Sequence, residues 1–199
     1  LEAAVQWWGV WVYVILFLII FAETGLIVMP LLPGDSLLFV AGAIAAVGGM
    51  SLPILLVSLM VAAIVGNTVN YSVGRWLGPK VFAWEHSRWF NREAFDRAHA
   101  FYEQYGPMTI VVTRFIPIIR TFAPFVAGVA QMSRAKFSIY NMAGGVFWVG
   151  SLTTLGYLLG EHPWVKAHFS FVALAMIVIP GLPAAWLISK NLLQKLVRR

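Results

Sequence analysis

Four charged residues lie inside otherwise apolar segments of this 199-residue chain, and they are the first candidates for chemistry. Glu23 and Asp35 are the two charges between residues 3 and 74, and Arg114 and Arg120 are the two between residues 104 and 133. Arginine presents a rigid fork of donors that fits a phosphate or carboxylate through two hydrogen bonds. Carboxylates take up and release protons. The residue types therefore predict an anion site at the arginine pair, with an acidic pair that exchanges protons.

The low content of charged residues indicates which class of protein this chain belongs to. Only 11% of the residues are charged and 60% are apolar, whereas about 25% are charged in an average soluble domain. A soluble domain of this size leaves about a third of its chain surface exposed, which is too much for this composition. The sequence predicts a single integral membrane domain, and the absence of cysteine excludes disulfides and thiolate metal sites.

The elements that position the four charges are predicted from apolar length and helix breakers. A membrane-spanning helix needs about 20 apolar residues, and four segments satisfy this: 3–22, 52–74, 137–160 and 167–189. Segments 23–49 and 107–132 are also apolar, but each carries two of the charges and several helix breakers, which in the second segment are Pro117 and Pro124. Broken backbone at membrane depth is tolerated only where protein or water satisfies it. We therefore predict two re-entrant helical hairpins in an all-α membrane fold.

The two hairpins share a short sequence. Phe39-Val40-Ala41-Gly42 in the first recurs as Phe125-Val126-Ala127-Gly128 in the second, so a hairpin followed by a span occurs twice. With both termini in the cytoplasm, the hairpins enter the membrane from opposite faces. This topology leaves 11 of the 14 Lys and Arg residues on the cytoplasmic side and only Lys166 outside, because the remaining two are the arginine pair. The pattern predicts an inverted repeat of broken helices, an architecture common in transporters.

Segment 79–105 is the polar stretch between the repeats. Apolar residues recur in it at helical spacing, at Phe95, Ala98, Tyr102 and Tyr105. We predict an amphipathic helix on the cytoplasmic membrane face, ending at Gly106 and Pro107. The net charge of +6 is assigned to such cytoplasmic flanks rather than to nucleic-acid binding.

If the hairpin tips meet inside the membrane, the four charges form one site. Arg114 and Arg120, with Thr121, would bind a phosphate headgroup, and Glu23 and Asp35 would handle protons. The other interpretation is a buried salt-bridge lock between the repeats, and the two are compatible. Two carboxylates beside two arginines disfavour a metal ion, and we expect no cofactor. The candidates for lining the cavity are Asn67, Asn70, Asn141, Pro33, Gly34, Pro117 and Pro124.

Several of these residues stand in motifs that closely resemble one family over nearly the whole chain. The motifs are Glu23 followed by Pro33-Gly34-Asp35, the block Arg114-Phe115-x-Pro117-x-x-Arg120-Thr121-x-x-Pro124, and Asn141 with Trp148. They resemble the DedA family of bacterial inner-membrane proteins, which carry the VTT domain. The resemblance implies that the acidic pair and the arginine pair are the functional residues. It also implies a place in lipid transport and envelope maintenance, with undecaprenyl phosphate as a substrate of related members.

We therefore expect a proton-coupled flippase for a lipid phosphate, most closely undecaprenyl phosphate, in the bacterial inner membrane. Its partners would be a membrane lipid and protons, with no nucleic acid, and a homodimer is a candidate assembly. Two alternatives stay open: a less selective phospholipid scramblase, and a proton-coupled transporter of a small anion. We do not expect an enzyme, because the histidines lie away from the four charges and no nucleophile motif occurs.

Overall fold

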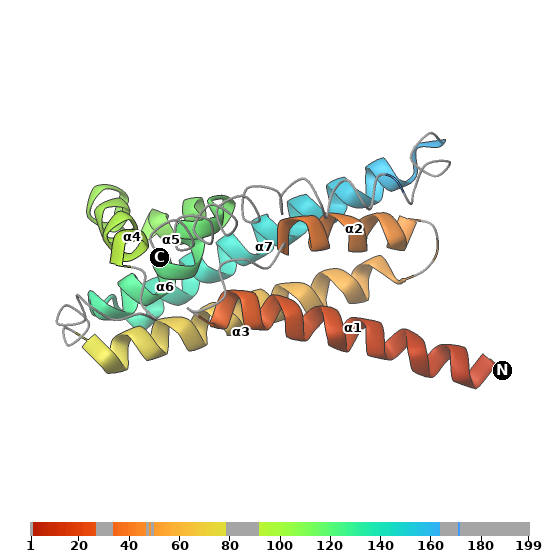
Figure 1. Ribbon diagram of the computed structural model, residues 1–199, viewed down its shortest axis with the longest axis horizontal. Helices are drawn as coiled ribbons and strands as arrows, with labels where there is room; N and C mark the ends of the chain where they lie inside the picture. Colours follow the sequence, from red (N-terminus) through yellow and green to blue (C-terminus); the bar gives the residue numbers. More distant parts are fainter. Residues whose placement is uncertain are drawn as a thin grey trace, which may run out of the picture. The chain divides into compact units, whose positions relative to one another are not determined.

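The computed structural model of this chain describes residues 2–26, 34–46, 48, 50–78, 92–163 and 171. Within these ranges the regular structure is entirely helical, as the composition predicted. The helices (Figure 1) are α1 (Glu2–Gly25), α2 (Gly34–Ala46), α3 (Leu52–Leu77), α4 (Arg92–Tyr105), η2 (Gly106–Met108), α5 (Thr109–Val112), η3 (Thr113–Phe115), α6 (Pro117–Val129) and α7 (Arg134–Gly160). The predicted span 167–189, apart from Phe171, lies outside the described residues, as do residues 27–33 and 79–91.

The chain divides into two compact units. The first comprises Leu1–Pro30 and Pro53–Ser151, and the second comprises Leu31–Leu52 and Leu152–Arg199. Helices α1, α3, α4, α5 and α6 and most of α7 therefore belong to the first unit, whereas α2 and the last turns of α7 belong to the second.

Helix α3 exposes mainly large apolar side chains and buries two amide side chains. Together with α7 it is one of two described helices that are long and apolar enough to cross a membrane, and both coincide with predicted spans. The hydroxyls of Thr68 and Ser72 on its exposed side each donate to a carbonyl one turn back, at 2.7 Å. Hydroxyls that face lipid need such internal acceptors. Its exposed large apolar side chains are Ile54, Val57, Val61, Val65, Val69, Val73 and Trp76, and its buried polar ones are Asn67 and Asn70.

Close backbone contact joins α3 to α6 in the first unit. A Cβ atom at Gly74 would lie 2.2 Å from the Phe125 carbonyl oxygen, and one at Gly128 would lie 2.2 Å from the Tyr71 carbonyl oxygen. Such distances are available only to glycine, because any Cβ would overlap the neighbouring backbone. The last turns of α3 and the second half of α6 are therefore in direct backbone contact at two points.

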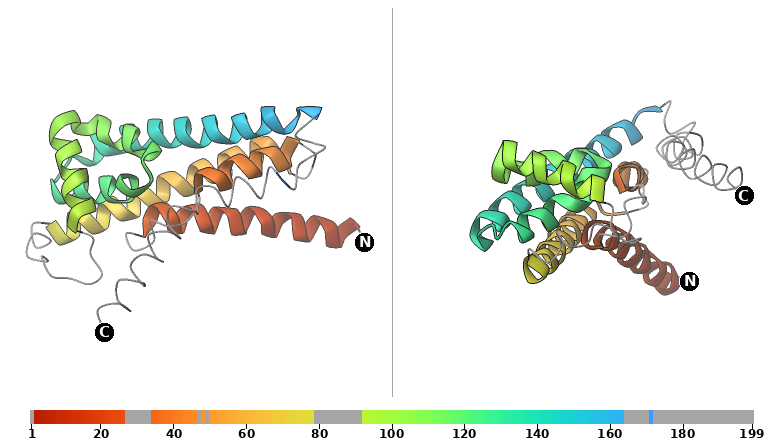
Figure 2. Two further views of the ribbon diagram at one scale, coloured as in Figure 1. Left: turned by 45° about the horizontal axis from the view of Figure 1, so that its top comes forward. Right: turned by 60° about the vertical axis from the view of Figure 1, so that its left-hand side comes forward.

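Helix α4 packs on the opposite side of α6, beside the last turn of α3 (Figure 2). Ala98 is fully buried against Phe122, Phe125 and Val126, with Tyr102 partly buried beside them. The helix predicted within segment 79–105 is present over Arg92–Tyr105. Two residues of its apolar stripe, Ala98 and Tyr102, pack against protein, whereas Tyr105 at its end is exposed, and the placement of this helix at the cytoplasmic membrane face stays a prediction.

The second predicted hairpin, 107–132, contains one sharp break in its backbone. Helical turns run from Gly106 to Phe115, and Ile116 is extended at φ −114° and ψ 101° before α6 begins at Pro117. Proline disfavours the helical conformation in the residue before it, which explains this position. Pro124 was also expected to act as a breaker, but it lies buried within α6, which continues to Val129. The loss of one N–H there is outweighed by the packing of α6 against α3 and α4.

In the second unit, α2 packs against the last turns of α7. A Cβ atom at Gly156 would lie 2.1 Å from the Phe39 carbonyl oxygen, and one at Gly42 would lie 2.0 Å from the Thr153 carbonyl oxygen. Helix α2 is the second half of the predicted hairpin 23–49, and it carries Asp35 in its first turn.

Candidate functional site

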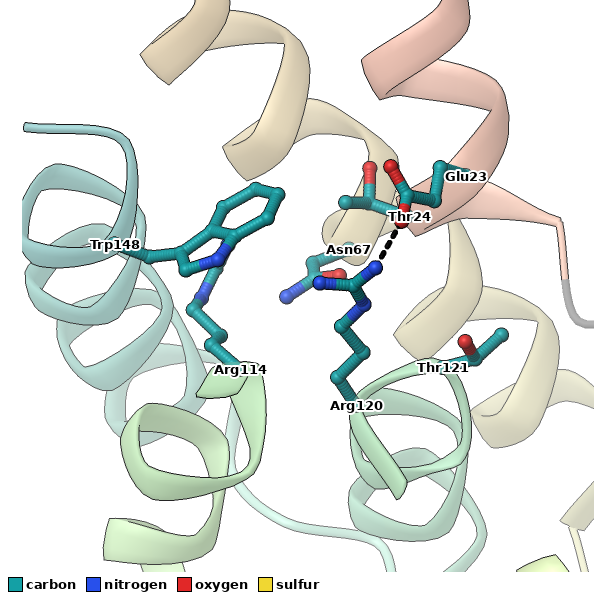
Figure 3. Close-up of a pocket in the computed structure, with 7 residues that line it drawn as sticks. All are labelled: Glu23, Thr24, Asn67, Arg114, Arg120, Thr121 and Trp148. Atoms are coloured by element: carbon teal, nitrogen blue, oxygen red, sulfur yellow. Dashed lines mark hydrogen bonds and ion pairs between the residues drawn. The ribbon is translucent and has the colours of Figure 1, made fainter. Parts of the chain in front are cut away.

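Three of the four predicted charges converge in the first unit on one small cavity (Figure 3). Its volume is about 10 Å³, which is room for about one water molecule. Each charged side chain at the cavity is buried, with exposed fractions of 2% for Glu23, 3% for Arg114 and 9% for Arg120. The residues that line it are Glu23 and Thr24 from α1, Asn67 from α3, Arg114 from η3, Arg120 and Thr121 from α6, and Trp148 from α7.

Glu23 and Arg120 form a buried ion pair across 97 residues of sequence. Arg120 Nη2 donates to Glu23 Oε1, and Figure 3 shows the guanidinium reaching from α6 to the carboxylate near the end of α1. Removing two charges from water is costly, and their attraction repays this only when the geometry is good and other hydrogen bonds support it. The pairing joins Glu23 and Arg120 into one electrostatic unit, because removing either charge would leave the other buried and unpaired.

Asn70 holds the two helices that carry this ion pair. Its Nδ2 donates to the carbonyl oxygen of Thr24 at 3.2 Å and to that of Thr121 at 2.8 Å. Thr24 follows Glu23 and Thr121 follows Arg120, so the amide fixes the separation of the two charged residues. At the same point Gly66 lets α1 approach α3, because a Cβ there would lie 2.0 Å from Thr24 Oγ1.

Arg114 is held differently, by an uncharged group. Its Nη2 donates to Asn141 Oδ1 at 2.6 Å and to the Asn141 carbonyl oxygen at 3.2 Å. The Asn141 Nδ2 in turn donates to Ile64 O at 2.9 Å and Thr68 Oγ1 at 3.2 Å, both on α3. Gly144 provides the space for the arginine, since a Cβ there would lie 3.0 Å from Arg114 Nε. Among the residues that the structure describes, Arg114 has no carboxylate partner.

Trp148 brings the two guanidinium groups to one surface. The Cζ atoms of Arg114 and Arg120 lie 5.9 Å and 5.4 Å from the centre of its ring, a cation–π distance for both. The indole is 1% exposed and lies beside the cavity (Figure 3). One indole ring thus lies near both like charges. Sequence reasoning did not select Trp148 as a site residue, although it follows Asn141 by seven residues on one face of α7.

Polar atoms at the cavity retain capacity for a ligand. Within the described part of the chain, Arg114 Nε and Thr121 Oγ1 are buried without a hydrogen-bond partner. Buried polar groups in proteins are almost always satisfied, so such atoms call for an explanation. Two guanidinium groups, one carboxylate and a hydroxyl around one cavity form a site suited to a small anionic group.

The structure separates the other predicted residues by position. Asn67 and Thr121 line the cavity, whereas Asn70 and Asn141 stand behind it and hold its arginines in place. Pro117 begins α6 and Pro124 lies within it, while Gly34 begins α2. Pro33 lies outside the described residues. Asp35 belongs to the second unit, so its association with the arginine pair stays a prediction.

The buried cluster of charges lies among helices whose exposed faces are largely apolar, and this combination defines a helical membrane protein with an internal charged site. The comparisons with known proteins then identify the family. A family model for the VTT domain matches residues 32–158. Protein DedA of Escherichia coli K12 is 48% identical over 178 residues, which cover 88% of this chain and 81% of that protein. This chain is a VTT-domain membrane protein of the DedA family.

Two further relatives are named as membrane proteins. The inner membrane protein YqjA of Escherichia coli K12 is 39% identical over 151 residues, which cover 76% of this chain and 69% of YqjA. An uncharacterized membrane protein of Mycobacterium tuberculosis, Rv0364, is 40% identical over 171 residues, which cover 85% and 75% of the two chains. No solved structure matches.

Proposed function

We propose that this protein is a flippase that moves a lipid phosphate, most closely undecaprenyl phosphate, across the bacterial inner membrane. The observation that carries the proposal is the environment of Arg114. Its buried guanidinium is held by the neutral amide of Asn141 at 2.6 Å and lies beside the Glu23–Arg120 ion pair. A buried cation needs a compensating anion, and a phosphate headgroup that accepts two hydrogen bonds from arginine supplies one.

The expected route of the headgroup passes through the ion pair. The cavity has room for about one water molecule, so a phosphate enters only when Glu23 and Arg120 separate. Protonation of Glu23 removes its charge and frees Arg120 for the phosphate, and loss of the proton re-forms the pair and expels the ligand. This exchange couples lipid movement to protons. The apolar tail stays in the bilayer throughout, and Asp35 is proposed as the second acidic group.

The glycine contacts support the inverted repeat that such a mechanism needs. Phe39 of the first hairpin lies against Gly156 of the later helix, and Phe125 of the second hairpin lies against Gly74 of the earlier helix. The recurring Phe-Val-Ala-Gly sequences therefore make equivalent contacts within the two units. We infer that both hairpins are re-entrant, that they enter from opposite faces, and that both chain termini are cytoplasmic.

The test is reconstitution in liposomes with wild-type protein and Glu23→Gln. The measurement is the movement of undecaprenyl phosphate, compared with phosphatidylethanolamine, with and without a pH gradient. We expect wild-type protein to move the lipid phosphate preferentially and to respond to the gradient. Glu23→Gln should lower the rate at least about tenfold and abolish the response, because Arg120 then has no carboxylate to exchange against the phosphate.

The outcomes separate the candidate functions. Equal movement of both lipids without a pH response would indicate a scramblase. Movement of neither lipid above that in protein-free vesicles would overturn the proposal and favour transport of a small soluble anion. A Glu23→Gln protein with the wild-type rate and pH response would contradict the coupling step.

A further inference from the structure

The two buried arginines differ in the charge of the group that holds them. Arg120 is paired with the carboxylate of Glu23, whereas Arg114 donates to the amide of Asn141. All hydrogen bonds of Arg114 among the described residues go to Asn141, through Oδ1 at 2.6 Å and the carbonyl oxygen at 3.2 Å. The amide thus fixes the position of the guanidinium without neutralising it.

The orientation of the Asn141 side chain is determined by both of its ends. Its oxygen faces the guanidinium, and its nitrogen donates to Ile64 O at 2.9 Å and Thr68 Oγ1 at 3.2 Å. A side chain at this position must therefore accept on one end and donate on the other. An ionised aspartate has the same shape but only acceptors, so it would neutralise Arg114 and face the Ile64 carbonyl oxygen.

Because the Asn141 amide is neutral, the positive charge of Arg114 is not cancelled and the cavity keeps a positive potential. Arg114 Nε is a buried donor without a partner in the described part of the chain, and the cavity is lined by two guanidinium groups and one carboxylate. A carboxylate at position 141 would balance that charge, and the attraction for a phosphate would be lost. A binding site can reject a ligand in this way, by carrying a like charge near the position that the ligand would occupy.

We propose that Asn141 determines the charge selectivity of this site, because it positions Arg114 by a neutral hydrogen bond and keeps the guanidinium charge available to an anionic headgroup. Asn141 is a positioning residue that acts through Arg114. The inference rests on the proposed function, since it assigns the basis on which an anionic lipid is preferred over a zwitterionic one.

The experiment compares Asn141→Asp with Asn141→Ser in the liposome assay, using undecaprenyl phosphate and phosphatidylethanolamine. Ser138→Asp is the matched control, because it adds the same charge one turn away on the exposed face of α7. We expect Asn141→Asp to lower the ratio of the two lipid rates about tenfold. Asn141→Ser should slow movement but keep the wild-type ratio, and Ser138→Asp should keep both rate and ratio.

A second measurement is independent of transport. Binding of dodecyl phosphate to the detergent-solubilised protein, followed by calorimetry, should be retained by Asn141→Ser and lost in Asn141→Asp. Thermal unfolding in detergent identifies a variant that is not folded. If Asn141→Asp does not fold, the test rests on Asn141→Ser. Equal rates for both lipids in this neutral variant would show that the preference does not depend on the charge of the side chain at position 141, and would overturn the inference.

Other outcomes distinguish this inference from the proposed function. If wild-type protein moves undecaprenyl phosphate preferentially and Asn141→Asp does so with the same ratio, the selectivity role of Asn141 is wrong and the flippase function stands. If wild-type protein moves neither lipid yet binds dodecyl phosphate and Asn141→Asp does not, the flippase function fails and the charge role stands.

Discussion

Two uncharged residues determine the position of the buried side chain of Arg114. Its guanidinium lies across Gly144 on α7 and donates to Asn141 one turn earlier. The glycine supplies space and the asparagine supplies an acceptor, so two neighbouring positions of one helix position the side chain. The position of the Arg114 guanidinium therefore depends on a hydrogen-bond acceptor at Asn141 and on the absence of a side chain at Gly144.

Gly144→Ala tests this arrangement directly. The added Cβ would lie 3.0 Å from Arg114 Nε and 3.2 Å from the Cα atom of Val111, so the arginine must shift by a few tenths of an ångström, which disturbs its hydrogen bonds to Asn141. We expect transport of the lipid phosphate to fall about tenfold. Gly150→Ala is the control on the same helix, because its Cβ would meet only the flexible end of Met60 at 3.4 Å. Equal activity of the two variants would show that the position of Arg114 is unimportant.

Helices α1 and α6 meet at the ion pair because a third helix joins them. Asn70 on α3 donates to the carbonyl after Glu23 and to the carbonyl after Arg120, at 3.2 Å and 2.8 Å. A carbonyl near the end of α1 otherwise lacks a donor within its own helix. The bond therefore completes the end of one helix and sets the distance between two charged elements.

Asn70→Leu tests whether Asn70 holds α1 and α6 together. Loss of both hydrogen bonds leaves the Thr24 carbonyl oxygen near the end of α1 without its donor, which costs about 1–3 kcal/mol for a buried group, whereas the Thr121 carbonyl still accepts a bond within α6. We expect a lower unfolding temperature in detergent and slower, less pH-dependent lipid movement, because the ion pair is no longer held at one distance. Ser72→Ala on α3 removes only a hydrogen bond within that helix and should match wild type. Unchanged stability in Asn70→Leu would argue against the clamp.

The chain as a whole repeats one contact in two places. In each unit a Phe-Val-Ala-Gly helix lies against a glycine on a long apolar helix, at Gly74 in the first unit and at Gly156 in the second. An inverted repeat predicts that the two hairpins open to opposite sides of the membrane. The orientation of the loops is therefore the property of the whole molecule that most needs measurement.

Single cysteines can report this orientation, because the chain contains none. Ser51 precedes α3 and Ser133 precedes α7, and both are exposed. The proposed topology places the first outside and the second in the cytoplasm. In intact spheroplasts, Ser51→Cys should react with a membrane-impermeant maleimide, and Ser133→Cys should react only after permeabilisation. Labelling of both from the same side would refute the inverted topology.

Local patterns were sufficient to predict much of this molecule. Apolar length predicted α3 and α7, and the residue before Pro117 was correctly expected to lie in a region of broken helix, because these depend on a few neighbouring residues. The four charges could be selected because charge is rare in apolar segments. Pro124 was misjudged as a breaker, since the packing that keeps α6 helical around it comes from distant helices.

The partners of the charged residues could not be predicted in the same way. Nothing local indicates that Glu23 pairs with Arg120, that Asn141 holds Arg114, or that Trp148 contacts both arginines. These contacts depend on which faces of helices far apart in sequence are brought together, and glycines at the crossing points set that approach. The residue types predicted an anion site, whereas the packing of the helices determines which arginine is paired with a carboxylate and which is held by a neutral amide.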